Sequence, residues 1–206
     1  STNGTFVNGV RVDRRELQAG DQLSIGEATL LLFTHSDGIE AGYQRGRFQS
    51  AVRDRATHAL RREVFLERLR EELSFARRRA AHLVVLAWEV DDLATLEARL
   101  GRPACERWLA SMAKAVKAVL RDEDVLGALG PGRLVVACPK LDLGAGRLLA
   151  TRVRAAVAGT PFEGAAGAAT ASVGLTAHDA SNGKADTADT MLDAAARGLD
   201  AARADG

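Results

Sequence analysis

Two kinds of apolar pattern alternate along most of this 206-residue chain and constrain its fold more than any other feature. Apolar residues three or four positions apart predict amphipathic helices, and short uninterrupted apolar runs predict buried strands. The helical patterns lie at 64–73, 93–100, 108–120, 148–157 and 191–202, with strand-like runs between them at 83–88, 134–138 and 170–175. This alternation predicts an α+β or α/β domain in which helices cover one central sheet.

The first 35 residues follow a different pattern, in which Gly, Asn and Asp separate short apolar runs. These runs predict strands at 5–7, 10–12, 22–25 and 30–33. Asn8-Gly9 predicts a two-residue hairpin turn, because both central residues of a type I′ turn need a positive φ. Glycines among charged residues then favour a linker. We therefore expect a small all-β unit at 1–35, a linker at 36–53 and the helix-and-sheet domain at 54–206.

Composition excludes several classes of function. The formal net charge is +1 and the isoelectric point is near 7.8, which gives no indication of nucleic acid or a membrane as partner. No apolar run approaches the roughly 20 residues of a membrane span, and no signal peptide is evident, so we expect a cytoplasmic location. Cys105 and Cys138 lie in apolar stretches and are expected to be buried free thiols. No cofactor or metal site is predicted.

The N-terminal turns carry a more specific pattern, Ser1-Thr2-Asn3-Gly4-Thr5-Phe6-Val7-Asn8-Gly9, followed by Leu17, Gly20-Asp21 and Ile25-Gly26. This pattern resembles the second half of a forkhead-associated (FHA) domain, a β-sandwich that binds phosphothreonine peptides. The resemblance implies that Thr2 touches the phosphate and Asn3 the peptide backbone. The phosphate-binding arginine and serine of the family precede this segment. We therefore expect the chain to be a fragment, and phosphothreonine-protein binding to need the complete domain of a longer protein.

Residues from Asp54 to the end carry a second resemblance. Asp54, Thr57, Arg62 and Phe65 match an opening D-x-L-T-G-L-x-N-R-x-x-F. The late strand has Ser172-Val173-Gly174, and a closing motif is matched by Ala195, Leu199, Ala202, Arg203 and Gly206. This order resembles the bacterial GGDEF domain of diguanylate cyclases. The resemblance implies a central, mostly antiparallel sheet flanked by helices. It also implies a reaction that joins two GTP molecules, with carboxylates that hold Mg²⁺ against the triphosphate.

Several positions depart from the motifs of that family. The signature G-G-D-E-F is replaced by Gly130-Pro131-Gly132-Arg133-Leu134. Proline fixes φ and removes an N–H, and Arg133 places a positive charge where the resemblance implies a metal-binding glutamate. By the same resemblance, departures also occur at the metal-binding positions Glu89-Val90-Asp91, at Leu93-Ala94, where a phosphate-contacting lysine is lost, and at the guanine-reading positions Glu97 and Glu106. We therefore predict a degenerate domain, a pseudoenzyme with no catalytic residue and no metal, which is not an enzyme.

One ligand site of the family is retained. Arg121-Asp122-Glu123-Asp124 is an R-x-x-D that, by resemblance, marks the inhibitory site for cyclic di-GMP, with Arg152 as a third member. An arginine fork donates to guanine O6 and N7 or to phosphate, and a carboxylate accepts from guanine N–H groups. We predict a cyclic di-GMP receptor coupled to the FHA module. Two alternatives stay open: an ordinary surface ion pair, and a nucleotide-independent scaffold that forms a homodimer or docks another protein.

Overall fold

The computed structural model describes residues 5–18, 21–25, 29–33, 52–162, 168–179 and 186–205. The chain divides into two compact units, Ser1–Gln49 and Ser50–Gly206, and each is described by itself. Most of the predicted linker at 36–53, together with Thr2 and Asn3, lies outside the described residues. The predicted domain boundaries therefore stay a prediction.

The N-terminal unit is a small antiparallel sheet. Its strands are β1 (Thr5–Val7), β2 (Val10–Val12), β3 (Gln22–Ile25) and β4 (Thr29–Leu32), in the order β2-β1-β3-β4. Asn8 and Gly9 have φ of 52° and 80°, which confirms the predicted hairpin. The buried Asp21 accepts hydrogen bonds from the Gln18 backbone N–H at 2.9 Å and from Asn8 Nδ2 at 2.7 Å. These bonds lower the pKa of Asp21 below its usual value.

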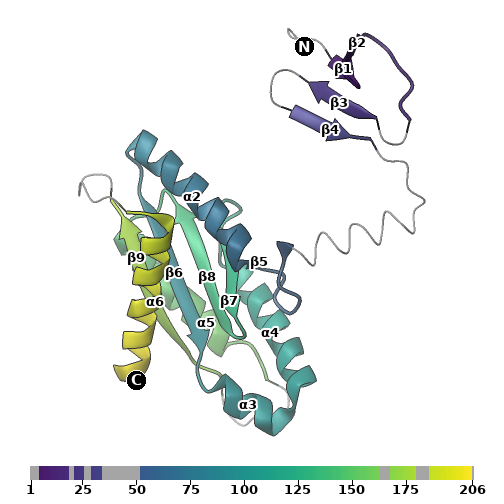
Figure 1. Ribbon diagram of the computed structural model, residues 1–206. Coiled ribbons are helices and arrows are strands. Elements are labelled where there is room, and N and C mark those ends of the chain that lie inside the picture. The colour runs from purple at the N-terminus through teal and green to yellow at the C-terminus, as the bar shows by residue number, and fades with distance from the viewer. Residues whose placement is uncertain are drawn as a thin grey trace. The chain divides into compact units, whose positions relative to one another are not determined.

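The C-terminal unit is built on a five-stranded sheet (Figure 1). In spatial order its strands are β5 (Leu60–Arg61), β7 (Val125–Gly130), β8 (Arg133–Pro139), β6 (Leu83–Val90) and β9 (Ala171–His178). The short β5–β7 pair is parallel, and the β7–β8, β8–β6 and β6–β9 pairs are antiparallel. The mostly antiparallel sheet flanked by helices is therefore confirmed.

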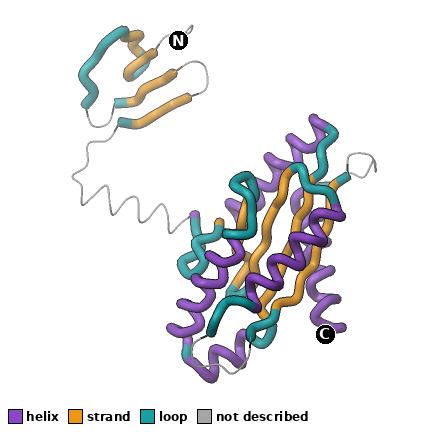
Figure 2. The backbone as a smooth tube through the Cα atoms, turned by 180° about the vertical axis from the view of Figure 1, so that it is seen from behind, coloured by secondary structure: helices purple, strands orange, loops and turns teal. Residues whose placement is uncertain are grey.

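Helices cover both faces of this sheet (Figures 1 and 2). The helices are α2 (Arg62–Arg79), α3 (Leu93–Leu100), α4 (Arg102–Lys117), α5 (Leu143–Ala158) and α6 (Ala188–Asp205). Alternate residues of β6 point to opposite faces, so Trp88 packs in the cluster with α4 and α5, while Val85 packs in the cluster with α2 and α6. Each such apolar side chain stabilises the fold by roughly 1.5–3 kcal/mol.

The sequence patterns did not predict β7. Its sequence, VLGALG, contains two glycines, which are depleted in strands and interrupt an apolar run. Close packing requires the glycine at position 127, because a Cβ there would lie 2.6 Å from ring atoms of Phe65 on α2. The helix predicted at 108–120 also begins earlier than expected, at Arg102, since Pro103 suits a first helical turn.

A search of the described residues found no helix with the length and apolar character needed to cross a membrane.

Candidate functional site

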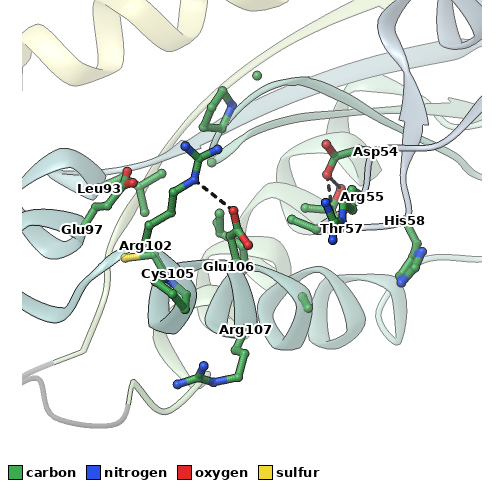
Figure 3. A pocket seen from close by; sticks show the side chains of 17 residues that line it. Asp54, Arg55, Thr57, His58, Leu93, Glu97, Arg102, Cys105, Glu106 and Arg107 are labelled. Atoms are coloured by element: carbon green, nitrogen blue, oxygen red, sulfur yellow. Dashed lines mark hydrogen bonds and ion pairs between the residues drawn. The ribbon is translucent and has the colours of Figure 1, made fainter. Parts of the chain in front are cut away.

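A cavity of about 840 Å³ lies beside the end of the sheet, between helices α3 and α4, the loop at 54–58 and the turn that joins β7 to β8 (Figure 3). Its lining combines acidic, basic and apolar groups. The residues concerned are Asp54, Arg55, Ala56, Thr57, His58, Leu93, Glu97, Arg102, Pro103, Cys105, Glu106, Arg107, Leu109, Ala110, Gly130, Pro131 and Gly132.

The charged part of this wall comes from the sharp connection between α3 and α4. Gly101, with φ of 83°, separates Glu97 at the end of α3 from Arg102 at the start of α4. Arg102 Nε lies 3.1 Å from Glu106 Oε1, one turn further along α4. Both side chains are largely exposed, and Arg107 points away from them (Figure 3). The wall therefore offers the carboxylates of Glu97 and Glu106, with one guanidinium group paired to Glu106.

The opposite rim is a loop fastened by its own side chains. Asp54 Oδ1 accepts hydrogen bonds from the backbone N–H of Thr57 at 2.9 Å and from its hydroxyl at 2.6 Å (Figure 3). His58 has a positive φ of 56°, and Arg53 Nη1 donates to the His58 carbonyl at 2.9 Å. Asp54 and Thr57, two residues of the opening motif, therefore shape the rim of the cavity.

The signature segment forms the turn between β7 and β8. Gly132 has φ of 68°, and a Cβ at this position would meet Leu93 of α3. Its carbonyl accepts a hydrogen bond from the Val90 N–H at 3.0 Å. The hairpin is thus formed although Pro131 and Arg133 stand in it, and it closes one side of the cavity.

Beside this turn, on the face of the sheet that carries α6, four charged side chains form a cluster: Glu89, Arg133, Asp200 and Arg203. Glu89 Oε2 lies 3.0 Å from both Arg133 Nε and Arg203 Nη1. Arg133 Nη2 donates to Asp200 Oδ1 at 2.5 Å. The Arg133 Nε–H is close to Glu89 without being aligned for a hydrogen bond, so this contact is an ion pair. We refer to these four residues as the Glu89 cluster.

The resemblance implies Mg²⁺ at this edge, and the residues present do not fit it. The one acidic side chain at the expected position, Glu89, is held by two guanidinium groups. Asp91, two residues on, accepts from the Ser172 hydroxyl at 2.9 Å. Within the described parts of the chain, no group of three or more His, Cys, Asp or Glu side chains is placed to hold a metal ion. A Mg²⁺ site needs several oxygen ligands around one point, which this arrangement does not supply.

The R-x-x-D residues lie in the turn between α4 and β7. Asp124 Oδ2 accepts from the backbone N–H of Arg121 at 2.8 Å, while Asp124 Oδ1 is buried and makes no hydrogen bond of good geometry. The Arg121 guanidinium is exposed and forms no ion pair with any described residue. Beneath the turn lies the buried Cys138. Burial, and then the negative charge of Asp124, raise the pKa of its thiol.

The structure therefore brings Arg121 and Asp124 together, through a backbone contact rather than an ion pair. Arg152 is exposed on α5, which packs beside α4. No hydrogen bond or ion pair within the described residues links Arg152 to the other two. Its place in a common site stays a prediction.

Comparison with known proteins identifies the fold. The model of the family "Diguanylate cyclase, GGDEF domain" matches residues 51–206, about three quarters of the chain. The chain belongs to the GGDEF family. The FHA domain model matches residues 1–26, in agreement with the resemblance of the N-terminal turns.

Among curated relatives, this GGDEF chain is 31% identical over 133 residues to the diguanylate cyclase DgcP of Pseudomonas aeruginosa. The match covers 64% of the chain and 20% of the relative, so the chain spans about one fifth of that protein. Among solved structures, it is similar to diguanylate cyclase SiaD of Pseudomonas aeruginosa in complex with its activator SiaC. The TM-score is 0.69 and the identity 26%, over 82% of this chain and 64% of that one.

The GGDEF domain of DgcB from Caulobacter crescentus, in complex with c-di-GMP, has the same fold. Its TM-score is 0.68 at 15% identity, over 76% of this chain and 89% of that one. A sensory box/GGDEF family protein from the same organism is similarly alike, with a TM-score of 0.68 at 22% identity, over 76% of this chain and 100% of that one.

These findings contradict the prediction that the chain is not an enzyme. The family to which it belongs is that of the diguanylate cyclases, and the 31% identical relative is one of them, so the prediction is wrong. It rested mainly on the replaced signature Gly130–Leu134, together with the departures at Glu89–Asp91, Leu93–Ala94, Glu97 and Glu106. The hairpin that contains them still forms, and the cavity beside it persists with carboxylates in its wall. The description of the domain as degenerate rests on the same departures and gains no support from these comparisons.

Sequence reasoning named most of the charged groups and missed some of their connections. It singled out Glu89, Glu97, Glu106 and Arg133, all of which lie in the cavity wall or in the Glu89 cluster. It did not foresee Asp200, which pairs with Arg133 from 67 positions away. The sequence gives one indication that Asp200 belongs near this site. Asp200 lies three positions before Arg203, and residues at i and i+3 share a helix face.

Proposed function

We propose that this chain is a signalling domain that binds cyclic di-GMP through Arg121 and Asp124, with Arg152 of the neighbouring helix as a third contact. Membership of the GGDEF family supports a role in cyclic di-GMP signalling. The DgcB domain, of the same fold, is known in complex with that ligand.

The observation that carries the proposal is that the Arg121 guanidinium is unpaired within the described residues. Arg121 is exposed and its backbone N–H holds Asp124, while its guanidinium has no ion-pair partner in the described parts of the chain. A guanidinium fork fits the O6 and N7 acceptors of guanine, or a phosphate oxygen pair, with two parallel hydrogen bonds. Asp124 Oδ1 is buried above the Cys138 thiol, and it could accept from guanine N1–H and N2–H only after the carboxylate turns outward.

Binding of a ligand to Asp124 requires the carboxylate to change its position. Its Oδ2 holds the turn through the Arg121 N–H, and its Oδ1 is below the surface. A ligand that uses this carboxylate must turn it outward and break the turn hydrogen bond. We therefore propose that Arg121 makes the first contact, and that the Asp124 contact forms with a local rearrangement of the turn at 121–124.

Calorimetric titration of cyclic di-GMP tests this proposal. We expect saturable binding to the wild type and a loss of at least about tenfold in affinity for Arg121→Ala, because a hydrogen bond to a charged group contributes about 1.5–3 kcal/mol. Arg77→Ala is the matched control: Arg77 is an exposed arginine near the end of α2, on the other face of the sheet. Absence of heat from the wild type at high micromolar ligand would rule out the receptor function.

Protein binding is a second candidate function, supported by the 26% identical SiaD structure, which contains its activator SiaC. We propose it in the form of a nucleotide-independent scaffold that docks a partner protein or a second copy. In a longer protein with a complete FHA domain, a phosphothreonine protein would be a further partner, with Thr2 and Asn3 in the binding loop. A cross-linking and mass-photometry series with and without cyclic di-GMP separates a constitutive dimer from a ligand-dependent one.

A further inference from the structure

The Glu89 cluster joins three elements at one end of the sheet. Glu89 comes from β6, Arg133 from the start of β8, and both Asp200 and Arg203 from the last turns of α6. Two carboxylates and two guanidinium groups make its formal charge zero. Its side chains are partly open to solvent, with exposed fractions of 22% for Glu89, 30% for Arg133 and 43% for Arg203.

Whether a cation can bind at Glu89 depends on how the charges of the cluster are arranged. Both guanidinium groups lie 3.0 Å from the same oxygen of Glu89, where a cation bound by that carboxylate would lie. Because these side chains are partly exposed, burial alone does not keep a cation out. A divalent ion would have to enter against two fixed positive charges, and the cluster offers it only the carboxylates of Glu89 and Asp200, both of which already pair with arginine. Oxygen-ligated cations take six or more ligands.

We infer that Arg133 and Arg203 take the place of a divalent cation at this edge of the sheet. They neutralise Glu89 with charges that belong to the chain, and the edge binds neither Mg²⁺ nor Mn²⁺. The same contacts fasten the end of α6 to β6 and β8. The inference is independent of cyclic di-GMP binding at Arg121, because it concerns a different end of the strands and a different ligand.

Mn²⁺ is the probe for this inference, since the electron paramagnetic resonance signal of the free ion falls when protein binds it. We expect the wild type to leave the signal unchanged at millimolar Mn²⁺. Arg133→Glu removes one positive charge and adds a carboxylate beside Glu89. We expect this variant to bind Mn²⁺ at least about tenfold more tightly than the wild type. The double variant Arg133→Glu with Glu89→Gln is expected to lose that binding again.

Arg77→Glu provides the matched control, because it makes the same charge change on α2 away from the cluster and is expected not to create a Mn²⁺ site. Saturable Mn²⁺ binding by the wild type that disappears in Glu89→Gln would overturn the inference. If circular dichroism shows that Arg133→Glu does not fold, the comparison of the wild type with Glu89→Gln still decides the question.

Discussion

Arg133 and Arg121 lie at opposite ends of the β7–β8 hairpin and are held in opposite ways. Arg133 pairs with Glu89 and Asp200, and its planar group is fixed between β6 and α6. Arg121 lies exposed in a turn and its guanidinium pairs with no described residue, while its backbone N–H donates to Asp124. An arginine with internal partners stabilises the fold, whereas an arginine without them remains available for a ligand. The two therefore predict opposite effects on stability and on binding.

The strongest test of the comparison disturbs the packing of α6, which carries two members of the Glu89 cluster, on the sheet. Gly174 of β9 lies under α6, and a Cβ at this position would overlap the backbone of Ala195, Gly198 and Leu199. We expect Gly174→Ala to lower the free energy of unfolding by about 3 kcal/mol or more, since backbone cannot give way as a side chain can. Urea unfolding followed by circular dichroism measures this.

Gly198→Ala is the matched control for that substitution. Gly198 faces Gly174 from α6, but a Cβ there would meet its nearest atom at 3.4 Å, an ordinary contact. Alanine also favours the helix by up to about 1 kcal/mol relative to glycine. We expect a neutral or stabilising effect. Equal destabilisation by both variants would mean that α6 does not approach β9 as closely as the structure indicates.

The next largest expected change in the free energy of unfolding concerns Glu89, whose carboxylate pairs with two arginines. Glu89→Gln leaves Arg133 and Arg203 facing each other without their common counter-charge. We expect a loss of about 1–2 kcal/mol, reduced from the value of a buried pair because the cluster is partly exposed. Asp200→Asn, whose side chain is 62% exposed, is expected to cost less than about 1 kcal/mol. A larger loss from Asp200→Asn than from Glu89→Gln would contradict this order.

Arg121→Ala completes the contrast, because we expect it to change binding and not stability. With no ion pair to lose, the free energy of unfolding should stay within about 0.5 kcal/mol of the wild type, while the affinity for cyclic di-GMP falls. Asp124→Ala should lower both, since it also removes the hydrogen bond to the Arg121 N–H, a bond that contributes about 1 kcal/mol. If Arg121→Ala destabilised the domain as much as Asp124→Ala does, Arg121 would be a structural residue.

Local patterns predicted the elements whose stability is local. The run at 83–88 is buried on both faces, and the helical spacing around Val153 places one face of α5 on the sheet, so both elements were predictable. Strand β7 was not, because Gly127, which interrupts its apolar run, is explained by packing against Phe65, some 60 positions earlier. Likewise, the sequence shows Arg133 in the signature, but its pairing with Asp200 depends on how α6 packs on the sheet and could not be predicted. Interactions between distant segments are what the sequence patterns could not supply.

The smallest expected effect is on the reactivity of the Cys138 thiol, whose pKa depends partly on the charge of Asp124. Burial and the nearby carboxylate raise the pKa of this thiol, so it should resist thiol reagents in the native protein. Asp124→Asn removes the negative charge and should lower that pKa. We expect slightly faster labelling at pH 8, limited by burial, as followed by mass spectrometry of the Cys138 peptide. Cys105, buried beside the cavity and remote from Asp124, is the internal control. If cyclic di-GMP turns Asp124 outward, the ligand should change the labelling of Cys138 in the wild type and leave Cys105 unaffected.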